Sequence, residues 1–344
     1  MSKINHQISG VPTNIITGFL GVGKTTTILQ LLKHKPKNQR WAVLVNEFGE
    51  IGIDGALLEG QVSEHQGVYI REVAGGCMCC TAGLTMRVAL AQLLRRAKPD
   101  RLLIEPTGLG HPQEVLHTLM DESFRSVLAV QKILTLVDAR HLANCRYLEH
   151  ETFQQQLAIA DVIVGNKVDL YQDSDKLVLA TYLQENISRD INLVFTEQGM
   201  IEPALLEGGK TIMAENSLDV QLPASEIAHT DDETNIPKCG FIKVVNEGEG
   251  YVSIGWRFSS ELSFDWRKLA AFLSGVKAQR LKATFITTSG NFAYNLSLDS
   301  LTQTPIEPLD QSRIEIISWY RNKNWEGQLF DCIKNKNQLK QINN

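Results

Sequence analysis

The chain has 344 residues, 43% of them hydrophobic, and a formal net charge of −5, which allows two domains with buried cores and argues against a general nucleic-acid-binding surface. No apolar run is long enough to span a membrane, and residues 1–12 lack the apolar core of a secretion signal. The six cysteines do not form the pattern of a disulfide framework, so we expect a cytoplasmic protein with reduced thiols that binds neither nucleic acid nor membranes.

Short apolar runs alternate with helical patterns through residues 1–209. The apolar runs predict buried strands at 14–17, 41–45, 69–73, 101–105, 132–137, 161–165 and 193–196. The segments between them predict helices at 25–33, 84–97, 113–120, 153–160 and 175–186. Such alternation favours a mainly parallel sheet covered on both faces, in which ligands bind beyond the carboxyl ends of the strands. We therefore predict an α/β domain over residues 1–209.

The pattern changes in residues 210–238, where small, acidic and turn-forming residues indicate a linker. The chain after it predicts strands at 241–245, 252–258, 283–288, 292–298 and 314–318, with helices at 265–273 and 325–334. This mixture predicts a smaller C-terminal α+β domain over residues 239–344.

A phosphate-binding loop lies at 18–25, where the residues follow the pattern G-x-x-x-x-G-K-T between a predicted strand and a predicted helix. Backbone N–H groups of such a loop face the phosphates, and the helix that follows adds a favourable dipole. The residues that we expect to bind phosphate or Mg²⁺ are Gly21, Val22, Gly23, Lys24, Thr25 and Thr26. Lys24 places its charge on the β- and γ-phosphates, where it also serves catalysis, and Thr25 offers its hydroxyl to Mg²⁺.

The nucleotide base is predicted to be guanine. Asn166, Lys167 and Asp169 form an N-K-x-D motif directly after a predicted buried strand. The carboxylate of such a motif accepts hydrogen bonds from N1–H and the 2-amino group of guanine, a donor pair that adenine lacks. Together with the phosphate loop, the motif predicts a P-loop GTPase domain with a mainly parallel sheet.

Acidic residues follow two further strands. Glu105 lies where an acidic side chain usually holds the Mg²⁺ shell, and Gly108 is placed to donate its N–H to the γ-phosphate. Glu47 and Asp54 follow the second strand, where either carboxylate could orient the attacking water or bind a metal. A solvated loop with helix caps is the alternative interpretation of these residues.

A dense thiol cluster, Cys77, Cys79 and Cys80, lies between a predicted strand and an amphipathic helix. Thiolates are soft ligands that suit Zn²⁺, and a helix N-terminus lowers their pKa. Three thiolates leave a tetrahedral Zn²⁺ one open position, which suits delivery better than a permanent structural role. The candidates for the fourth ligand are Glu47, Glu50, His111 or a partner protein, while redox chemistry at the thiols is the alternative.

These motifs together resemble the CobW-type GTPases, the group that includes cobalamin-synthesis, nitrile-hydratase-activator and zinc metallochaperone proteins. The resemblance rests on residues 18–26, 45–50, 75–80, 105–109 and 166–169. The sequences of segments 52–58 and 98–105 are similar to those of the bacterial zinc-binding branch known as YeiR. It implies a slow GTPase whose hydrolysis is altered by metal bound at the cysteines. It also implies that the C-terminal domain binds an unidentified client metalloprotein. A homodimer is compatible with the resemblance.

The linker departs from the family pattern, because many members carry a histidine-rich stretch there and this chain has only His229. That departure speaks against metal storage and places the metal function on the cysteines. Cobalt or nickel remain alternatives to zinc as the metal.

We expect a nucleotide-gated zinc chaperone that uses GTP, Mg²⁺ and Zn²⁺. The alternative function is a GTPase switch that senses redox state or metal without delivering metal. A third possibility is a P-loop kinase acting on a small molecule. Such a kinase would prefer ATP, whereas the N-K-x-D motif favours GTP. A zinc buffer, in which nucleotide only stabilises the fold, predicts that Lys24→Ala leaves zinc handling intact.

Overall fold

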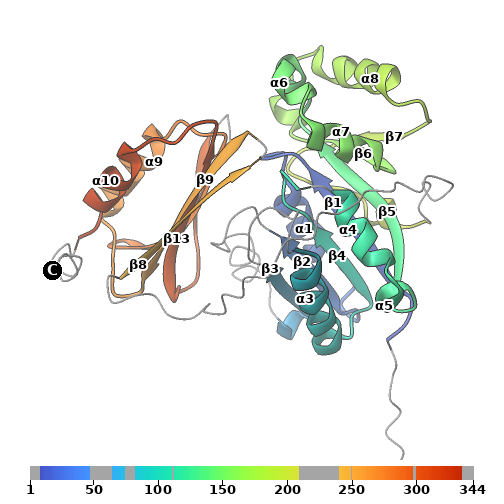
Figure 1. Cartoon of the computed structure of the whole chain (residues 1–344), viewed down its shortest axis with the longest axis horizontal. Helices are drawn as coiled ribbons and strands as arrows, with labels where there is room; N and C mark the ends of the chain where they lie inside the picture. Colours follow the sequence, from blue (N-terminus) through green and yellow to red (C-terminus); the bar gives the residue numbers. More distant parts are fainter. Residues whose placement is uncertain are drawn as a thin grey trace, which may run out of the picture. The chain divides into compact units, whose positions relative to one another are not determined.

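The computed structural model describes residues 8–46, 64–73, 82–110, 112–208, 240–248, 250–296 and 300–334. These residues fall into two compact units, an N-terminal one ending at 208 and a C-terminal one from 240 to 334, each built on its own sheet (Figure 1). The predicted linker and both of its boundaries lie in 209–239, outside the described residues, so the exact domain limits stay a prediction.

The N-terminal sheet has seven strands in the order β3-β2-β4-β1-β5-β6-β7, and every neighbouring pair is parallel. The strands are β1 (Val11–Gly18), β2 (Trp41–Asn46), β3 (Val68–Val73), β4 (Arg101–Glu105), β5 (Leu128–Val137), β6 (Val162–Gly165) and β7 (Asn192–Phe195). The prediction of a parallel α/β fold is therefore confirmed, with each of the predicted strands present. The lengths differ most at β1 and β5, each of which is four residues longer than its predicted run. The start of β5 was missed because its first half is mostly only partly buried and carries a weaker apolar pattern.

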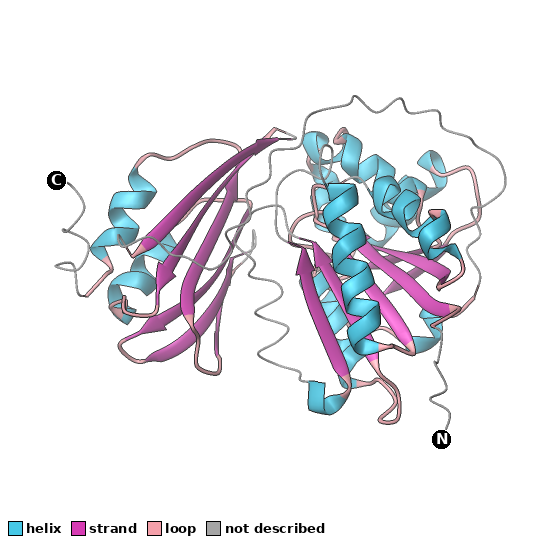
Figure 2. Ribbon diagram, turned by 60° about the horizontal axis from the view of Figure 1, so that its bottom comes forward, coloured by secondary structure: helices cyan, strands magenta, loops and turns pink. Residues whose placement is uncertain are grey.

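Helices lie over both faces of this sheet (Figure 2). The longer ones, all predicted, are α1 (Lys24–Lys33), α3 (Ala82–Ala97), α4 (Pro112–Met120), α7 (Glu151–Ala158) and α8 (Asp175–Asn186). Single-turn elements were not predicted, and they are α5 (Glu122–Arg125), α6 (Cys145–Leu148), η1 (Glu64–Gln66), η2 (Ala139–Ala143), η3 (Val168–Leu170) and η4 (Pro203–Leu206). They escape prediction because one turn is too short to show a helical period.

The core explains why the central strands read as continuous apolar runs. All five residues of β4 are buried, since helices cover the sheet on both faces. One face carries Ile15, Leu44 and Ile104 in a cluster with apolar side chains of α3, α4 and α5. Because every neighbouring pair of strands is parallel, the carboxyl ends of the strands lie at one edge of the sheet.

A buried polar network joins the start of β4 to η4. The Arg101 side chain is 7% exposed, donates to Asn14 Oδ1 at 2.6 Å and pairs with Glu207. Its guanidinium carbon lies 5.5 Å from the ring centroid of Trp41. Asn14 Nδ2 in turn donates to the Leu206 carbonyl at 2.8 Å. The network thus ties the last described segment of this unit to the sheet, through contacts distant in sequence.

The C-terminal unit is an antiparallel sheet with two helices (Figure 1). Its strand order is β12-β11-β10-β13-β9-β8, and all described pairs are antiparallel. The elements are β8 (Phe241–Gly248), β9 (Tyr251–Ser259), α9 (Trp266–Gly275), β10 (Arg280–Thr287), β11 (Gly290–Leu296), β12 (Leu301–Pro305), β13 (Gln311–Ser318) and α10 (Asn324–Asp331). The α+β prediction is confirmed, but β12 was missed because this edge strand is largely exposed and carries little apolar pattern.

Helix α9 begins one residue later than predicted. The carboxylate of Asp265 accepts hydrogen bonds from the N–H groups of Arg267 and Lys268 at 3.0 and 3.1 Å, so Asp265 is the N-cap and not the first helical residue. These two hydrogen bonds, that from Lys268 foremost, hold the pKa of the Asp265 carboxyl below its usual value. No helix in the described ranges has the length and apolarity needed to cross a membrane.

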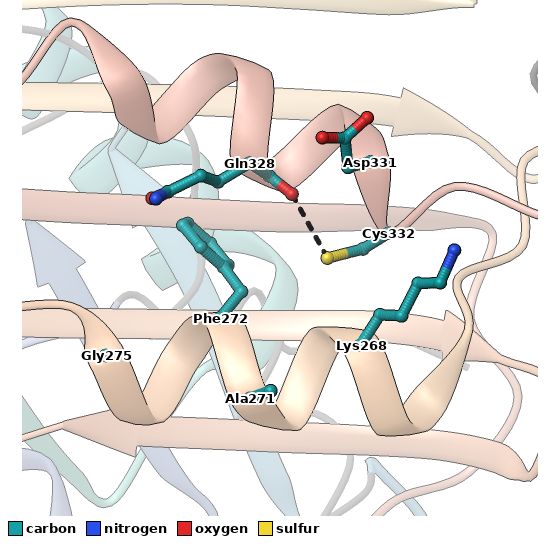
Figure 3. A pocket seen from close by; sticks show the side chains of 7 residues that line it. All are labelled: Lys268, Ala271, Phe272, Gly275, Gln328, Asp331 and Cys332. Carbon is teal, nitrogen blue, oxygen red and sulfur yellow. Dashed lines mark hydrogen bonds between the residues drawn. The ribbon is translucent and has the colours of Figure 1, made fainter.

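A hollow of about 510 Å³ lies between α9 and α10 (Figure 3). It is open to solvent and includes Lys268, Phe272 and Asp331. The thiol of Cys332 is buried there and donates to the Gln328 carbonyl at 3.2 Å. Cys332 is therefore a core thiol, whereas Cys145 is exposed.

We predict that Arg101→Met lowers the unfolding free energy of the N-terminal unit by about 1–3 kcal/mol, because the buried Asn14 Oδ1 loses its donor. Native-state hydrogen exchange of peptides from β1 and β4 measures this unit separately. The matched control is Arg96→Met, which removes an exposed ion pair with Glu64 and should change stability by less than about 1 kcal/mol. Equal effects of the two changes would contradict a structural role for the network.

Candidate nucleotide and metal site

The sequence-predicted nucleotide residues gather at the carboxyl edge of the N-terminal sheet. The phosphate loop follows β1, Glu105 ends β4, and the N-K-x-D motif follows β6. Strand β1 lies between β4 and β5, so the chain reverses its direction across the sheet at this point. Parallel α/β sheets bind ligands at such switch points.

Two glycines allow the phosphate loop to approach its neighbours. Gly18 and Gly23 have φ values of 140° and 102°, which side chains rarely adopt. A Cβ on Gly18 would lie 2.4 Å from the Leu136 carbonyl oxygen, and one on Gly23 would lie 2.4 Å from Asn166 Nδ2. The loop therefore packs directly on the ends of β5 and β6, which fixes its position above the sheet.

Lys24 is held by the loop itself. Its side chain is buried, and Nζ donates to the carbonyl oxygens of Gly18 and Phe19 at 2.9 and 3.0 Å. The ammonium group thus lies over the start of the loop, where a positive point charge meets incoming phosphate oxygens. The helix N-terminus at Lys24 adds its dipole to the same position.

Thr25 and Glu105 are in direct contact. Thr25 Oγ1 donates to Glu105 Oε1 at 2.9 Å, although the two residues are far apart in the chain. Glu105 is 2% exposed, and its carboxylate is a hard oxygen ligand of the kind that Mg²⁺ prefers. This pair fits an Mg²⁺ ion that would be held by the Thr25 hydroxyl, with Glu105 bonded to the water shell of the ion.

The segment after β4 lies against the phosphate loop. A Cβ added to Gly108 would lie 3.0 Å from Lys24 Nζ and 3.0 Å from the Leu20 backbone nitrogen. Gln156 on α7 donates from Nε2 to the Gly108 carbonyl at 3.1 Å. A backbone that touches the loop this closely is suited to respond to a γ-phosphate, and Gln156 connects it to the next helix.

Asn166 links the motif to the loop. Its Nδ2 donates to the Val22 carbonyl at 2.8 Å, and its Oδ1 accepts from the Gly199 N–H at 3.1 Å. Lys167 adopts a left-handed conformation with φ 65°. The chain turns there from the buried Asn166 to the exposed Asp169, whose carboxylate is accessible to a base. Asn166 therefore positions the two loops to which it is hydrogen-bonded.

Sequence reasoning missed two contributors. The loop after β7 reaches the site, since a Cβ on Gly199 would lie 2.6 Å from Thr27 Oγ1 on α1. Asp138, at the end of β5, is fully buried and pairs with Arg140 at 2.6 Å and with Lys167 at 3.5 Å. Each of them directly follows a strand in the sheet, and that placement is the signal that could have identified them.

Several predicted site residues lie outside the described residues, and they are Glu47, Glu50, Asp54, Cys77, Cys79, Cys80 and His111. Their flanking elements are described. The cysteine run leaves the carboxyl end of β3 and enters α3 at Ala82, and the segment with Glu47 and Asp54 leaves the carboxyl end of β2. Within the described residues, no group of three or more His, Cys, Asp or Glu side chains could hold a metal.

Comparison with known proteins adds a family and relatives. A family model described as the CobW/HypB/UreG nucleotide-binding domain matches residues 12–194. The zinc chaperone YeiR of Escherichia coli (strain K12) is 40% identical over 320 residues, covering 89% of this chain and 92% of the relative. The zinc chaperone CobW of a Sinorhizobium species is 33% identical over a match that covers 58% of this chain and 62% of the relative. The zinc-regulated GTPase metalloprotein activator 1 of Schizosaccharomyces pombe is 32% identical over a match that covers 48% of this chain and 42% of the relative.

We predict that Gly23→Ala weakens the binding of a fluorescent guanosine nucleotide by at least about tenfold, because its Cβ displaces the Asn166 amide from the loop. Fluorescence titration measures the affinity. Gly10→Ala is the matched control, since Gly10 also has a positive φ of 63° but has no heavy atom within 4 Å of the added Cβ. Equal losses in both variants would show that backbone strain alone, without the Asn166 contact, causes the effect.

Proposed function

The chain belongs to the CobW/HypB/UreG nucleotide-binding family, and from this premise we propose that it is a GTPase that binds zinc and transfers it to a client protein. The observation that supports this most directly is the assembly of Lys24, Thr25, Glu105 and Asn166 at one edge of the sheet. The choice of zinc and the delivery role are proposed because the relatives are named as zinc chaperones.

The described residues are suited to hold a nucleoside triphosphate. Lys24 would neutralise the β- and γ-phosphates, and the Thr25 hydroxyl would hold Mg²⁺ while Glu105 would accept hydrogen bonds from the water around the ion. Mg²⁺, when bound, would neutralise charge that develops on the phosphate oxygens in hydrolysis. The Gly108 N–H lies on the segment that touches Lys24 and is placed for the γ-phosphate. Glu47 or Asp54 orients the attacking water.

Zinc is the cargo, and its ligands are Cys77, Cys79 and Cys80. The carboxyl end of β3 lies three strand positions from β1, a distance of roughly 14 Å at the usual spacing of strands. The cysteine run therefore starts at the edge of the sheet that carries the phosphate loop. The loop after β2, which carries the candidate catalytic carboxylates, starts between the cysteine run after β3 and the segment after β4, because β2 lies between these two strands.

This arrangement supports nucleotide gating. Binding of GTP, with Mg²⁺ at Thr25 and Glu105, would order the segments after β2 and β4, and this ordering would favour zinc binding by the cysteine run that starts from the neighbouring strand. Hydrolysis removes the γ-phosphate and loosens the same segments, so zinc is released to the client. Coupling between two binding sites is reciprocal, so a nucleotide that tightens zinc binding must itself be bound more tightly in the presence of zinc by the same factor.

We predict that a variant with Ser at Cys77, Cys79 and Cys80 loses tight zinc binding, and that Mg²⁺ with a non-hydrolysable GTP analogue raises the zinc affinity of the wild type about fivefold or more. Competition with a chromophoric chelator measures the affinity. Cys145→Ser is the matched control, because it replaces an exposed isolated thiol and should leave zinc affinity unchanged.

Two results would argue against this proposal. A zinc affinity that is indifferent to the nucleotide would leave a GTPase that merely holds a metal. Zinc handling that survives Lys24→Ala intact would show that nucleotide binding only stabilises the fold.

We further predict that Asp169→Ala reduces the preference for GTP over ITP about tenfold or more, because ITP lacks the 2-amino group that the carboxylate accepts from. Competition between the two nucleotides for the same site measures the ratio. Asp173→Ala, at another exposed aspartate in the following loop, should keep the preference of the wild type. An unchanged ratio in Asp169→Ala would assign base recognition to other residues.

A further inference from the structure

The turn that carries Asp169, η3, is three residues long and follows the buried strand β6. The side chain of Asp169 is exposed, so it is not held in place by burial. A single turn of this kind also has little stability of its own. The position of the Asp169 carboxylate therefore depends on the elements that hold the two ends of the turn.

The first end of the turn, at Lys167, is held by Asp138. Lys167 has a φ of 65°, a left-handed conformation that is uncommon outside glycine and persists where the surrounding structure enforces it. Its Nζ lies 3.5 Å from Asp138 Oδ2, and its side chain is 18% exposed while that of Asp138 is fully buried. Removing one partner of such a buried pair is costly, so the pair fixes the direction in which the Lys167 side chain leaves the turn.

The carboxylate of Asp138 is itself held firmly. Arg140 donates to it twice, from Nε to Oδ1 at 2.9 Å and from Nη2 to Oδ2 at 2.6 Å. The backbone N–H of Arg140 donates to Oδ1 as well, at 3.2 Å, and His141 Nε2 lies 3.9 Å from Oδ2. A carboxylate with bidentate pairing has little freedom to move, so it provides Lys167 with a fixed partner.

The second end of the turn, at Tyr171, is held by the same segment. The Tyr171 hydroxyl accepts from the Ala139 N–H at 2.9 Å and donates to the Val137 carbonyl at 3.4 Å. Burial, the largest cause, raises the pKa of the Tyr171 phenol well above its usual value, so the hydroxyl keeps the proton that it donates. Residues 137–139, at the carboxyl end of β5, thus hold η3 at both ends.

We propose that residues 137–139 position the carboxylate of Asp169 against the guanine base, and that Asp138 and Tyr171 are the positioning residues that set the preference for guanine. The inference rests on the proposed role of Asp169 in base recognition. Both residues act through the turn and need no contact with the nucleotide. Losing either one displaces the acceptor of the 2-amino group, while the phosphate contacts of Lys24 remain, because the phosphate loop is held by Asn166 and not by η3.

The test compares the affinities for GTP and ITP in Asp138→Asn and in Tyr171→Phe, by competition with a fluorescent guanosine nucleotide. Each change keeps the approximate size of the side chain and removes one charge or one hydroxyl. We expect each to lower the ratio of GTP affinity to ITP affinity about threefold or more. Neither should lower it further in a chain that already carries Asp169→Ala, because both act through that carboxylate. The affinity for inorganic tripolyphosphate, which has no base, should stay that of the wild type.

Each variant has a matched control. Asp161→Asn also changes a buried aspartate, which accepts from the Ile133 N–H at 2.8 Å and precedes the start of β6, at the opposite edge of the sheet. Tyr182→Phe removes a phenol hydroxyl on α8 that accepts from Gln154 Nε2 at 2.8 Å. Both controls should keep the nucleotide ratio of the wild type.

The outcomes separate this proposal from the one on which it rests. A wild-type ratio in folded Asp138→Asn or in Tyr171→Phe would overturn positioning alone, and Tyr171→Phe decides if Asp138→Asn does not fold. A further fall of the ratio in the Asp169→Ala chain, or an equal loss of tripolyphosphate affinity, would overturn it too, since the effect would not pass through Asp169. A wild type without preference for GTP over ITP, or an unchanged ratio in Asp169→Ala, would overturn base recognition by Asp169 and this proposal with it.

Discussion

The side-chain amide of Asn166 holds the nucleotide edge of the N-terminal sheet together. It donates to the phosphate loop at Val22 and accepts from the loop after β7 at Gly199. Both bonds are buried, so losing either one leaves a polar group without a partner in the interior. Gly23 must lack a side chain for the amide to fit. The motif that the sequence marks as a base-recognition signal therefore has a second role, since it sets the position of the loop that receives the phosphates.

The remaining contacts at this edge follow from the parallel sheet. The strands run parallel, so the residues after β1, β4 and β6 lie at the same edge of the sheet although they are far apart in the chain. Thr25 reaches Glu105 in this way, and Gly108 touches Lys24. The segment with Glu47 and Asp54 and the segment with the cysteines start from the neighbouring strands β2 and β3. In the proposed mechanism, coupling between nucleotide and zinc would therefore involve segments that start a short distance apart on one sheet.

The C-terminal unit is built on a different plan, and its chemistry differs accordingly. Its antiparallel sheet places α9 and α10 over a core that includes Trp256, and the turn into α10 carries an excess of positive charge. The N-terminal unit carries the nucleotide-binding edge, and the C-terminal unit is packed around a separate core of its own.

Local patterns in the sequence were sufficient for the parallel sheet and the five longer helices around it, because strand and helix periods are contiguous signals. The two nucleotide motifs are contiguous as well, so the sequence also showed which strands they follow. They were not sufficient for β12, whose exposed residues carry no such period, or for single-turn helices. The contacts of Arg101 with Asn14, of Asn166 with Gly199 and of Lys243 with Trp256 join residues distant in the chain. The sequence by itself determined which chemical groups are present and which elements carry them. Only the tertiary structure decided which of these groups touch, because contact between distant residues depends on how the strands are ordered in the two sheets.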